Sequence, residues 1–196
     1  MIKSKKDYLY YLEADKIALG IKGTWTDFFM NDIWKFEQLL RKLEFYNNCK
    51  TSFFWKIYIL FLKIRFHSIS TRLCFTIPPN VFGPGLSIGH RGTLVVNGFA
   101  KVGSNCRIHN CVYIATNAGY TDNAPKIGNN VYIGPGVKIF GPIEIADNIA
   151  IGANSVVTKS FLEPGITIAG IPAKKISNKG SDGLLIKATE LLKSSN

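Results

Sequence analysis

Residues 124–160 read APKIGNNVYIGPGVKIFGPIEIADNIAIGANSVVTKS and carry an aliphatic side chain at every sixth position. An α-helix repeats its apolar face every 3.6 residues and a β-strand every 2 residues, so neither element explains this spacing. A period of six indicates short straight segments joined by corners, and hexapeptide repeats are typical of parallel β-helices. The aliphatic positions are Ile127, Ile133, Ile139, Ile145, Ile151 and Val157.

The same period extends toward the N-terminus, with two interruptions. Phe82, Ile88 and Leu94 keep the count, a two-residue slip follows, and the count resumes at Val102 and continues through Ile108 and Ile114. Three hexads make one coil, so residues about 18 positions apart stack on one face. The second interruption covers residues 115–126 and predicts a loop pushed out from a corner. Such a loop is either an ordinary connection or a functional segment.

The regions outside the repeats predict helices. Residues 1–74 form an N-terminal helical region, with one helix starting after a capping box at Ser4 and Asp7 and others over 28–47 and 52–69. Residues 75–178 form the β-helix domain, and the tail 179–196 holds a short helix over 182–193. The predicted fold class is therefore mainly β, a parallel β-helix flanked by helices.

Charge is concentrated in one part of the chain. The net charge is +11, and no Asp or Glu lies between Phe45 and Thr121. This favours anionic partners such as phosphates, acidic sugars or acidic lipids, whereas nucleic acid is disfavoured because no nucleic-acid-binding motif accompanies the charge. The helix over 52–69 is too short and too interrupted by lysines to span a bilayer. It packs on the β-helix or a sister subunit, or it lies on an acidic membrane surface.

The cysteines and the N-terminus predict a cytoplasmic protein, with a position at the inner face of the membrane left open. The N-terminal segment has no apolar core of a signal peptide. The cysteines lack zinc-type spacing and are predicted to be free core thiols in a reducing compartment. They are Cys49, Cys74, Cys106 and Cys111.

Two of the three histidines fall in the repeats. His90 lies two positions after Ile88, and Asn110 lies two positions after Ile108, one coil later, with His109 beside it. These three side chains should therefore cluster on one edge of the prism, beside the loop at 115–126. A lone histidine usually has a structural role. For two stacked histidines, a functional role and a structural role are equally expected.

Three motifs carry a resemblance to a known family: PPNVFGPGLSIGH at 78–90, the repeats at 124–160 and AGIPAKKI at 169–176. With them the chain resembles the hexapeptide-repeat acyltransferases of the serine acetyltransferase-like group, which includes polysaccharide O-acetyltransferases. The resemblance implies a left-handed β-helix that forms homotrimers, with pairing of trimers left open. It implies active sites between neighbouring prisms and direct transfer of acetyl from acetyl-CoA to a hydroxyl, with no metal.

The resemblance also implies roles for individual residues. His90 matches the family's general base, and a neutral imidazole, with an ordinary pKa of about 6.5, suits that task. The acceptor would be bound near this base and the loop, and the acetyl-CoA donor along the later coils. The acceptor residues are His109, Asn110, Tyr120 and Asp122; the donor residues are Gly134 and Gly136 at the pantetheine, Ala153 through its main chain, Thr158 and Lys159 at the adenine end, and Lys174 near the phosphates.

The chain departs from serine acetyltransferases at two positions. The aspartate that orients the base corresponds to Phe75, and a second histidine of the serine-binding region corresponds to Ala124. A backbone carbonyl, Asp122 or another subunit must then orient His90. The departures predict a sugar hydroxyl as acceptor, in a surface polysaccharide or its precursor. Serine O-acetylation in cysteine biosynthesis and a non-enzymatic β-helix assembly subunit remain as alternatives.

Overall fold

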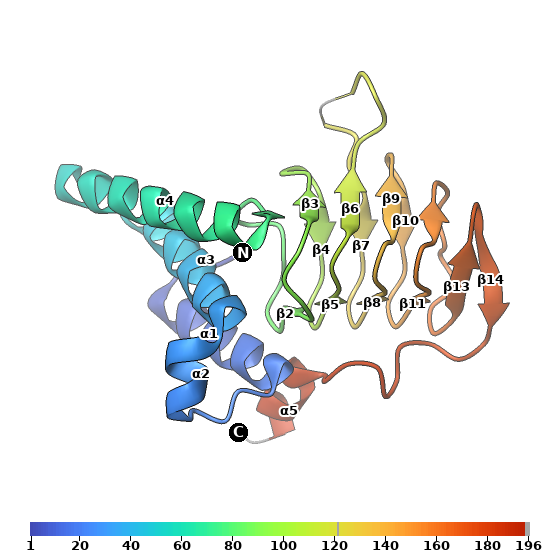
Figure 1. Cartoon of the computed structure of the whole chain (residues 1–196), viewed down its shortest axis with the longest axis horizontal. Helices are drawn as coiled ribbons and strands as arrows, with labels where there is room; N and C mark the ends of the chain where they lie inside the picture. The colour runs from blue at the N-terminus through green and yellow to red at the C-terminus, as the bar shows by residue number, and fades with distance from the viewer. Residues whose placement is uncertain (121, 195–196) are drawn as a thin grey trace.

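The computed structural model describes residues 1–120 and 122–194, and Figure 1 shows a group of helices at one end of a prism of short strands. The prism has three faces, here called A, B and C, and its strands are parallel except for the last pair. The predicted β-helix is thus confirmed. Face A holds β1 (Phe75–Thr76), β3 (Leu94–Val96), β6 (Val112–Ala115), β9 (Lys138–Phe140) and β12 (Val156–Val157). Face B holds β4 (Lys101–Val102), β7 (Lys126–Ile127) and β10 (Glu144–Ile145). Face C holds β2 (Ser87–Ile88), β5 (Arg107–Ile108), β8 (Tyr132–Ile133), β11 (Ala150–Ile151), β13 (Thr167–Gly170) and β14 (Ala173–Ser177).

The six-residue period corresponds to one inward side chain per strand. On face C the strand pairing aligns one isoleucine from each successive coil, and every one of them is buried. Because each coil stacks its apolar side chain directly on the next, the prism has a continuous core along its axis. The aligned residues are Ile88, Ile108, Ile133, Ile151 and Ile168.

The two-residue slip lies one strand earlier than the sequence predicts. The partner of Ile114 on face A is Val96, not Leu94, so the count from Val96 to Val102 is an uninterrupted six. The two additional residues therefore fall between Ile88 and Leu94. This corner has five residues, 89–93, where the next coil has three, 109–111. The slip thus widens the corner that carries His90.

The helices occupy the N-terminal end of the prism, and two of their predicted boundaries were wrong. The predicted helix over 28–47 is two helices, because the Asn31 side chain accepts a hydrogen bond from the N–H of Trp34 at 3.0 Å and starts a new helix. The C-terminal helix begins at Ala188 rather than 182, because Gly183 adopts a left-handed conformation, φ 79°, that a helix excludes. The helices are α1 (Lys5–Leu19), α2 (Trp25–Met30), α3 (Asp32–Cys49), α4 (Phe53–Leu73) and α5 (Ala188–Ser194).

A buried network of charges joins the helices to the first coil. Arg41 is fully buried and pairs with Asp15 at 2.7 Å and with Glu44 at 3.0 Å. Its guanidinium also donates to the carbonyls of Phe82 and Gly83, at 2.9 and 2.7 Å. In return, the Asp15 carboxylate accepts hydrogen bonds from the backbone N–H groups of residues 85 and 86. Burying this many charges requires that each be paired, so the network fixes how the first coil sits on the helices.

The C-terminal tail runs back along the prism to the helices (Figure 1). Three corner asparagines with positive φ form a ladder, in which Asn105 donates to Asn130 at 2.8 Å and Asn130 donates to Asn148 at 3.0 Å. Thr189 of α5 exchanges two hydrogen bonds with the side chain of Asn105, at 2.7 and 3.1 Å. Ala188 packs in an apolar cluster with alanines of α1. The tail therefore ties the middle coils to the first helix.

Two further expectations concern the surface. Among the described residues, no helix is long and apolar enough to cross a membrane. All four cysteines are free, as predicted, but only Cys106 is a core thiol. Cys74 and Cys111 are exposed, because both occupy left-handed positions, where a helix ends and at a coil corner.

Candidate functional site

One edge of the prism, between faces C and A, gathers five of the eleven predicted site residues. We call it the histidine edge, and it consists of the two residues that follow each aligned isoleucine of face C. Strand register places His90, Asn110, Pro135, Ala153 and Gly170 at equivalent positions in successive coils. Coils stack about 4.8 Å apart, so the edge runs roughly 14 Å from His90 to Ala153.

The two histidines lie side by side on this edge. The ring centroids of His90 and His109 are 5.7 Å apart, and the ring of Tyr132 lies 5.2 Å from that of His109 on the other side. Gly89 makes room for this arrangement, because a Cβ atom there would lie 2.7 Å from Nδ1 of His109. The predicted clustering of His90, His109 and Asn110 is thus present in the coordinates, with Tyr132 and Gly89 as members that the sequence did not reveal.

The two imidazoles occupy different environments. His90 is exposed, whereas Nε2 of His109 is buried and has no hydrogen-bond partner among the described residues. Burial lowers the pKa of His109, and the positive charge of Arg107 and the neighbouring His90 lower it further. Arg107 is held in place by a hydrogen bond to Ser87 at 3.1 Å. His109 therefore stays neutral to lower pH than an ordinary histidine. His90 is the histidine that solvent and ligands can reach.

The described residues give the His90 imidazole no hydrogen-bond partner. One acid of the helices, Asp32, pairs with Arg91, the residue after His90, at 3.7 Å and with Arg72 at 3.3 Å. Sequence reasoning missed Asp32 because it lies 58 positions from His90 and no local pattern connects them. Asp32 therefore lies near the corner that carries His90, but it pairs with Arg91 and Arg72 and not with the histidine.

The two departures from serine acetyltransferases have different surroundings. Phe75 is buried and packs edge-on against Phe36 of α3, with ring centroids 5.0 Å apart. The position that would orient the base is thus part of the core between helices and prism. Ala124 is half-buried at the end of the loop, and its N–H donates to the carbonyl of Asp122 at 3.0 Å.

The extruded loop leaves the prism at a different edge from the histidines. His109 and Asn110 come just before β6, whereas the loop follows the end of β6 (Figure 1). A strand of four residues covers roughly 13 Å, so the loop and the histidine edge of one chain lie at opposite ends of this strand. Tyr120 and Asp122 are both exposed, and neither contacts a residue of the histidine edge in the part of the chain that the structure describes. Thr121 between them lies outside the described residues.

Of the two glycines of the predicted donor site, Gly134 lies on the histidine edge and Gly136 lies one residue beyond it. A Cβ atom at Gly134 would lie 2.9 Å from the backbone N of Ala153, and one at Gly136 would collide with the Asn154 side chain. Glycine at these two positions therefore lets adjacent coils stack closely. Ala153 itself is exposed, which leaves its main chain open to a ligand.

The remaining predicted donor residues flank this edge. Lys174 of β14 is exposed and pairs in register with Ala169 of β13, next to the far end of the histidine edge. Thr158 and Lys159 follow β12 and lie across face A, at the edge where the loop emerges. Both are exposed, and the Lys159 ammonium lies 5.4 Å from the ring centroid of Phe161. Within residues 1–120 and 122–194, no group of His, Cys, Asp and Glu side chains has the arrangement of a metal site.

Comparison with known proteins agrees with this description. Residues 124–159 match the family of bacterial transferase hexapeptide repeats, described as six repeats. A serine acetyltransferase of Synechococcus elongatus is 35% identical over 99 residues, which are 50% of this chain and 40% of that protein. The chain thus spans less than half the length of this curated relative.

Solved structures cover more of the chain. A Brucella abortus serine acetyltransferase in complex with coenzyme A superposes with a TM-score of 0.68 and 28% identity, over 89% of this chain and 68% of that one. A Neisseria gonorrhoeae serine acetyltransferase in complex with serine gives a TM-score of 0.69 and 28% identity, over 89% and 71%. Both matches extend beyond the prism, so the helical region shares the likeness.

The repeats and the prism define the class: the chain has the fold of the hexapeptide-repeat proteins, a left-handed parallel β-helix with a helical N-terminal region and a short C-terminal helix. Its relatives described here, in sequence and in structure, are serine acetyltransferases.

Proposed function

We propose that this protein is an O-acetyltransferase that moves an acetyl group from acetyl-CoA to a hydroxyl, with His90 as the general base. The observation that carries the proposal is the histidine edge. It places the exposed imidazole of His90 on one edge with Gly134 and Ala153, and Gly136 lies directly beside that edge. Serine acetyltransferases solved with coenzyme A are among the structures that resemble this fold.

The reaction uses the imidazole twice. The acceptor hydroxyl attacks the thioester carbonyl while His90 takes its proton, because a neutral hydroxyl is a weak nucleophile. When the carbon–sulfur bond breaks, the imidazolium returns the proton to the leaving sulfur. The products are an acetyl ester and free coenzyme A, and the histidine is neutral again.

The donor fits the edge by shape and by charge. The pantetheine arm would extend along the coils from His90 toward Ala153, a length of roughly 14 Å. Lys174 at the far end is exposed and free to meet the phosphates of the donor. Thr158 and Lys159 belong to the opposite side of face A, so they would contact a donor held by a neighbouring prism.

Serine is the acceptor that the comparisons favour, because the relatives described above are serine acetyltransferases. This supports the alternative to the sugar acceptor that the sequence predicts first. The sugar hydroxyl stays as a second candidate because Phe75 and Ala124 replace the two residues of the serine enzymes. Both acceptors use the same base and the same donor, so the proposed reaction holds for either.

We infer a homotrimer from the position of the loop. Tyr120 and Asp122 belong to the loop at the end of β6 that is remote from the histidine edge, and neither forms a hydrogen bond with that edge among the described residues. In a trimer whose active sites lie between neighbouring prisms, as the family resemblance implies, the loop of one chain reaches the histidine edge of the next. Asp122 is then available to orient His90 from another subunit.

The test is thiol release from acetyl-CoA with serine and with a panel of sugars as acceptors. His90→Ala is expected to lose at least about a hundredfold in kcat, the usual contribution of a general base. His67→Ala is the matched control, because His67 is an exposed histidine on α4 outside the site. Undiminished turnover of His90→Ala would remove His90 from the role of base. Absence of acetyl-CoA binding in calorimetry would favour a non-enzymatic β-helix subunit instead.

A further inference from the structure

One face of α4 is apolar and uncovered. Its aliphatic and aromatic side chains follow the i, i+4, i+7, i+8, i+11 spacing of a single helix face. Each exposes at least half of its surface, while Ile59 and Leu62 on the opposite side pack on α3. We call this face the α4 stripe, and it consists of Phe53, Ile57, Leu60, Phe61 and Ile64.

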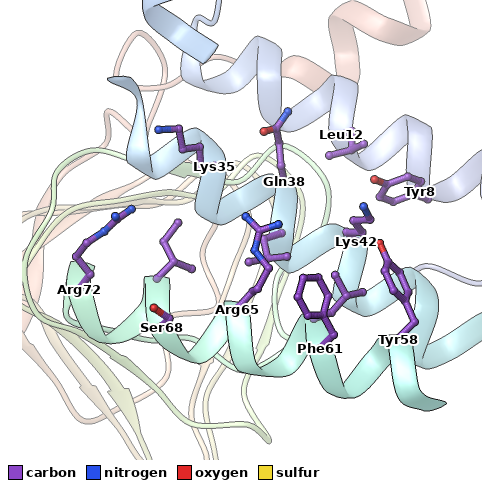
Figure 2. Close-up of a pocket in the computed structure, with 13 residues that line it drawn as sticks. Tyr8, Leu12, Lys35, Gln38, Lys42, Tyr58, Phe61, Arg65, Ser68 and Arg72 are labelled. Atoms are coloured by element: carbon purple, nitrogen blue, oxygen red, sulfur yellow. The ribbon is translucent and has the colours of Figure 1, made fainter. Parts of the chain in front are cut away.

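A basic groove borders the stripe on the side of α1 and α3. It has a volume of about 690 Å³, and Figure 2 shows Phe61 of the stripe at its rim with Arg65 and Lys42 pointing into it. Lys35 and Arg72 lie at its other end, where Asp32 pairs with both, at 3.4 and 3.3 Å. No acidic side chain is among the described residues that line the groove.

A second basic groove borders the other side of the stripe. It has a volume of about 620 Å³, is reached past Leu60, and is lined by Lys50, Lys56 and Lys63. No described acidic side chain lines this groove either. The stripe thus lies between two rows of cations, and α4 itself contains no Asp or Glu.

This arrangement of apolar and basic side chains indicates which kind of partner binds the α4 stripe. An apolar stripe flanked on both sides by Lys and Arg matches a helix that lies in the interface of a membrane, with its apolar side chains in the acyl boundary and its cations at lipid phosphates. A second copy of the same face would set cations against cations without an acid to pair them, which disfavours self-association. The exposed side chains of the stripe belong to residues 53–64, the part of α4 that extends away from the prism (Figure 1).

We propose that the α4 stripe and its two basic grooves dock this protein on an anionic membrane surface. The stripe supplies the apolar insertion, and the cations of both grooves bind the phosphate groups of acidic lipids. This attachment is peripheral and places the prism in the solution beside the membrane. It is independent of the proposed acetyl transfer, because none of its residues belongs to the histidine edge.

Co-sedimentation with vesicles tests the apolar part. The probe is phosphatidylcholine vesicles with and without phosphatidylglycerol, and the wild-type chain is expected to bind only those that contain the anionic lipid. Leu60→Glu should lower the partition coefficient about tenfold or more, since it removes an apolar side chain that would insert into the membrane and adds a charge that the anionic lipids repel. Leu9→Glu is the matched control, because Leu9 on α1 is exposed to a similar extent, 53% against 59% for Leu60.

A second pair of variants, which lose the same charge at two different places, tests the contribution of the cations beside the stripe. Replacing Lys56 and Lys63 together by Gln should weaken binding about 20-fold, because each cation near an anionic surface contributes about a fivefold effect. Replacing Lys5 and Lys6 on α1 by Gln removes the same charge away from the stripe and should have little effect. Binding of the wild-type chain should weaken steeply with added salt.

Two results would overturn the proposal. The first is equal or absent binding to both kinds of vesicle. The second is a Leu60→Glu protein whose assembly, measured by light scattering, is smaller than the wild type, which would show that the stripe is an interface between copies of the chain. Acetyl transfer measured in the same samples separates these results from a failure of the proposed reaction, because vesicle binding and turnover are independent readouts.

Discussion

The Glu37 carboxyl group accepts a hydrogen bond from the backbone N–H of Ile88 at 3.2 Å, directly behind the corner that presents His90. Glu37 is fully buried on α3, and its second oxygen has no partner among the described residues. Burial raises the pKa of this carboxyl well above its ordinary value, and the nearby Asp15 raises it further. A helix of the N-terminal region therefore holds the backbone of the histidine corner through a protonatable group.

This relationship predicts a pH effect on stability. The folded protein keeps a proton on Glu37 that the unfolded chain releases at the ordinary glutamate pKa, so this group contributes stability that falls as pH rises through the raised pKa. Glu37→Gln keeps the hydrogen-bond acceptor and removes the titration. The melting temperature of Glu37→Gln, relative to that of the wild type, should therefore rise as the pH increases from about 5 to about 8. The rise should be about 2–4 °C for each kcal/mol of unfolding free energy that the wild type loses over this range.

The control for this effect is Glu13→Gln, an exposed glutamate on α1. Its melting temperature should track the wild type across the same pH series at fixed protein concentration. Parallel curves for Glu37→Gln and the wild type would contradict the assignment of a raised pKa to Glu37.

Loss of Arg41 should separate the helices from the first coil. Arg41→Met leaves Asp15 and Glu44 buried without their cation, and breaking a buried ion pair in this way costs about 3–5 kcal/mol. Chemical denaturation measures the loss. Lys16→Met removes an exposed cation of α1 and should cost less than about 1 kcal/mol. If Arg41→Met lowered the free energy of unfolding as little as Lys16→Met, the buried charges would not be what holds the first coil on the helices.

The His109 imidazole should titrate below the ordinary histidine range. Arg107→Gln removes one of the causes of the lowered pKa, so the midpoint of His109 should move upward in this variant, as followed by NMR of the ring protons. Because the folded state resists protonation, His109 contributes stability that is lost as pH falls below the ordinary histidine pKa. An unchanged midpoint in Arg107→Gln would assign the lowered pKa to burial and the neighbouring His90.

Gly89 should be essential for the position of His109. Gly89→Ala places a methyl group 2.7 Å from Nδ1 of His109, so the ring must move, at a cost of about 1–3 kcal/mol. Gly98→Ala is the control, because its methyl group would meet Pro78 at an ordinary contact of 3.7 Å. We expect a larger loss of acetyl transfer in Gly89→Ala than in Gly98→Ala. Equal activities would show that the site does not depend on the placement of His109.

Thr189 should contribute to the free energy of unfolding, although it lies near the C-terminus. Thr189→Val removes the hydroxyl that accepts from the buried Asn105 side chain, and leaving such a donor unpaired costs about 1–3 kcal/mol. Thr51→Val, at an exposed position, should be neutral in the same unfolding experiment. A neutral Thr189→Val would show that α5 is not held by the asparagine ladder.

The period of six made the prism predictable because each strand places one aliphatic residue inward. The position of the slip was not predictable in the same way. Leu94 and Val96 are both apolar and both buried, so either fits the count, and only the backbone pairing of Val96 with Ile114 decides between them. A register shift between two equivalent apolar residues leaves no trace in the hydrophobic pattern.

The candidate site was predictable where it follows the repeat and not where it depends on distant segments. His90, His109 and Asn110 share an edge because they share a position in successive hexads. Asp15, Glu37 and Arg41 look like ordinary surface charges of amphipathic helices. They become buried only when the first coil packs on those helices, which is a long-range contact that spacing does not encode.

The return of the C-terminal tail changes how the prism should unfold. A stack of repeats contacts only its neighbours and ordinarily frays from its two ends. Here Thr189 and Ala188 connect the middle coils to α1, so the end of the chain cannot open without releasing contacts made by its beginning. Hydrogen exchange should therefore report one cooperative unit, with amide protection as high in the first coil as in the middle of the prism.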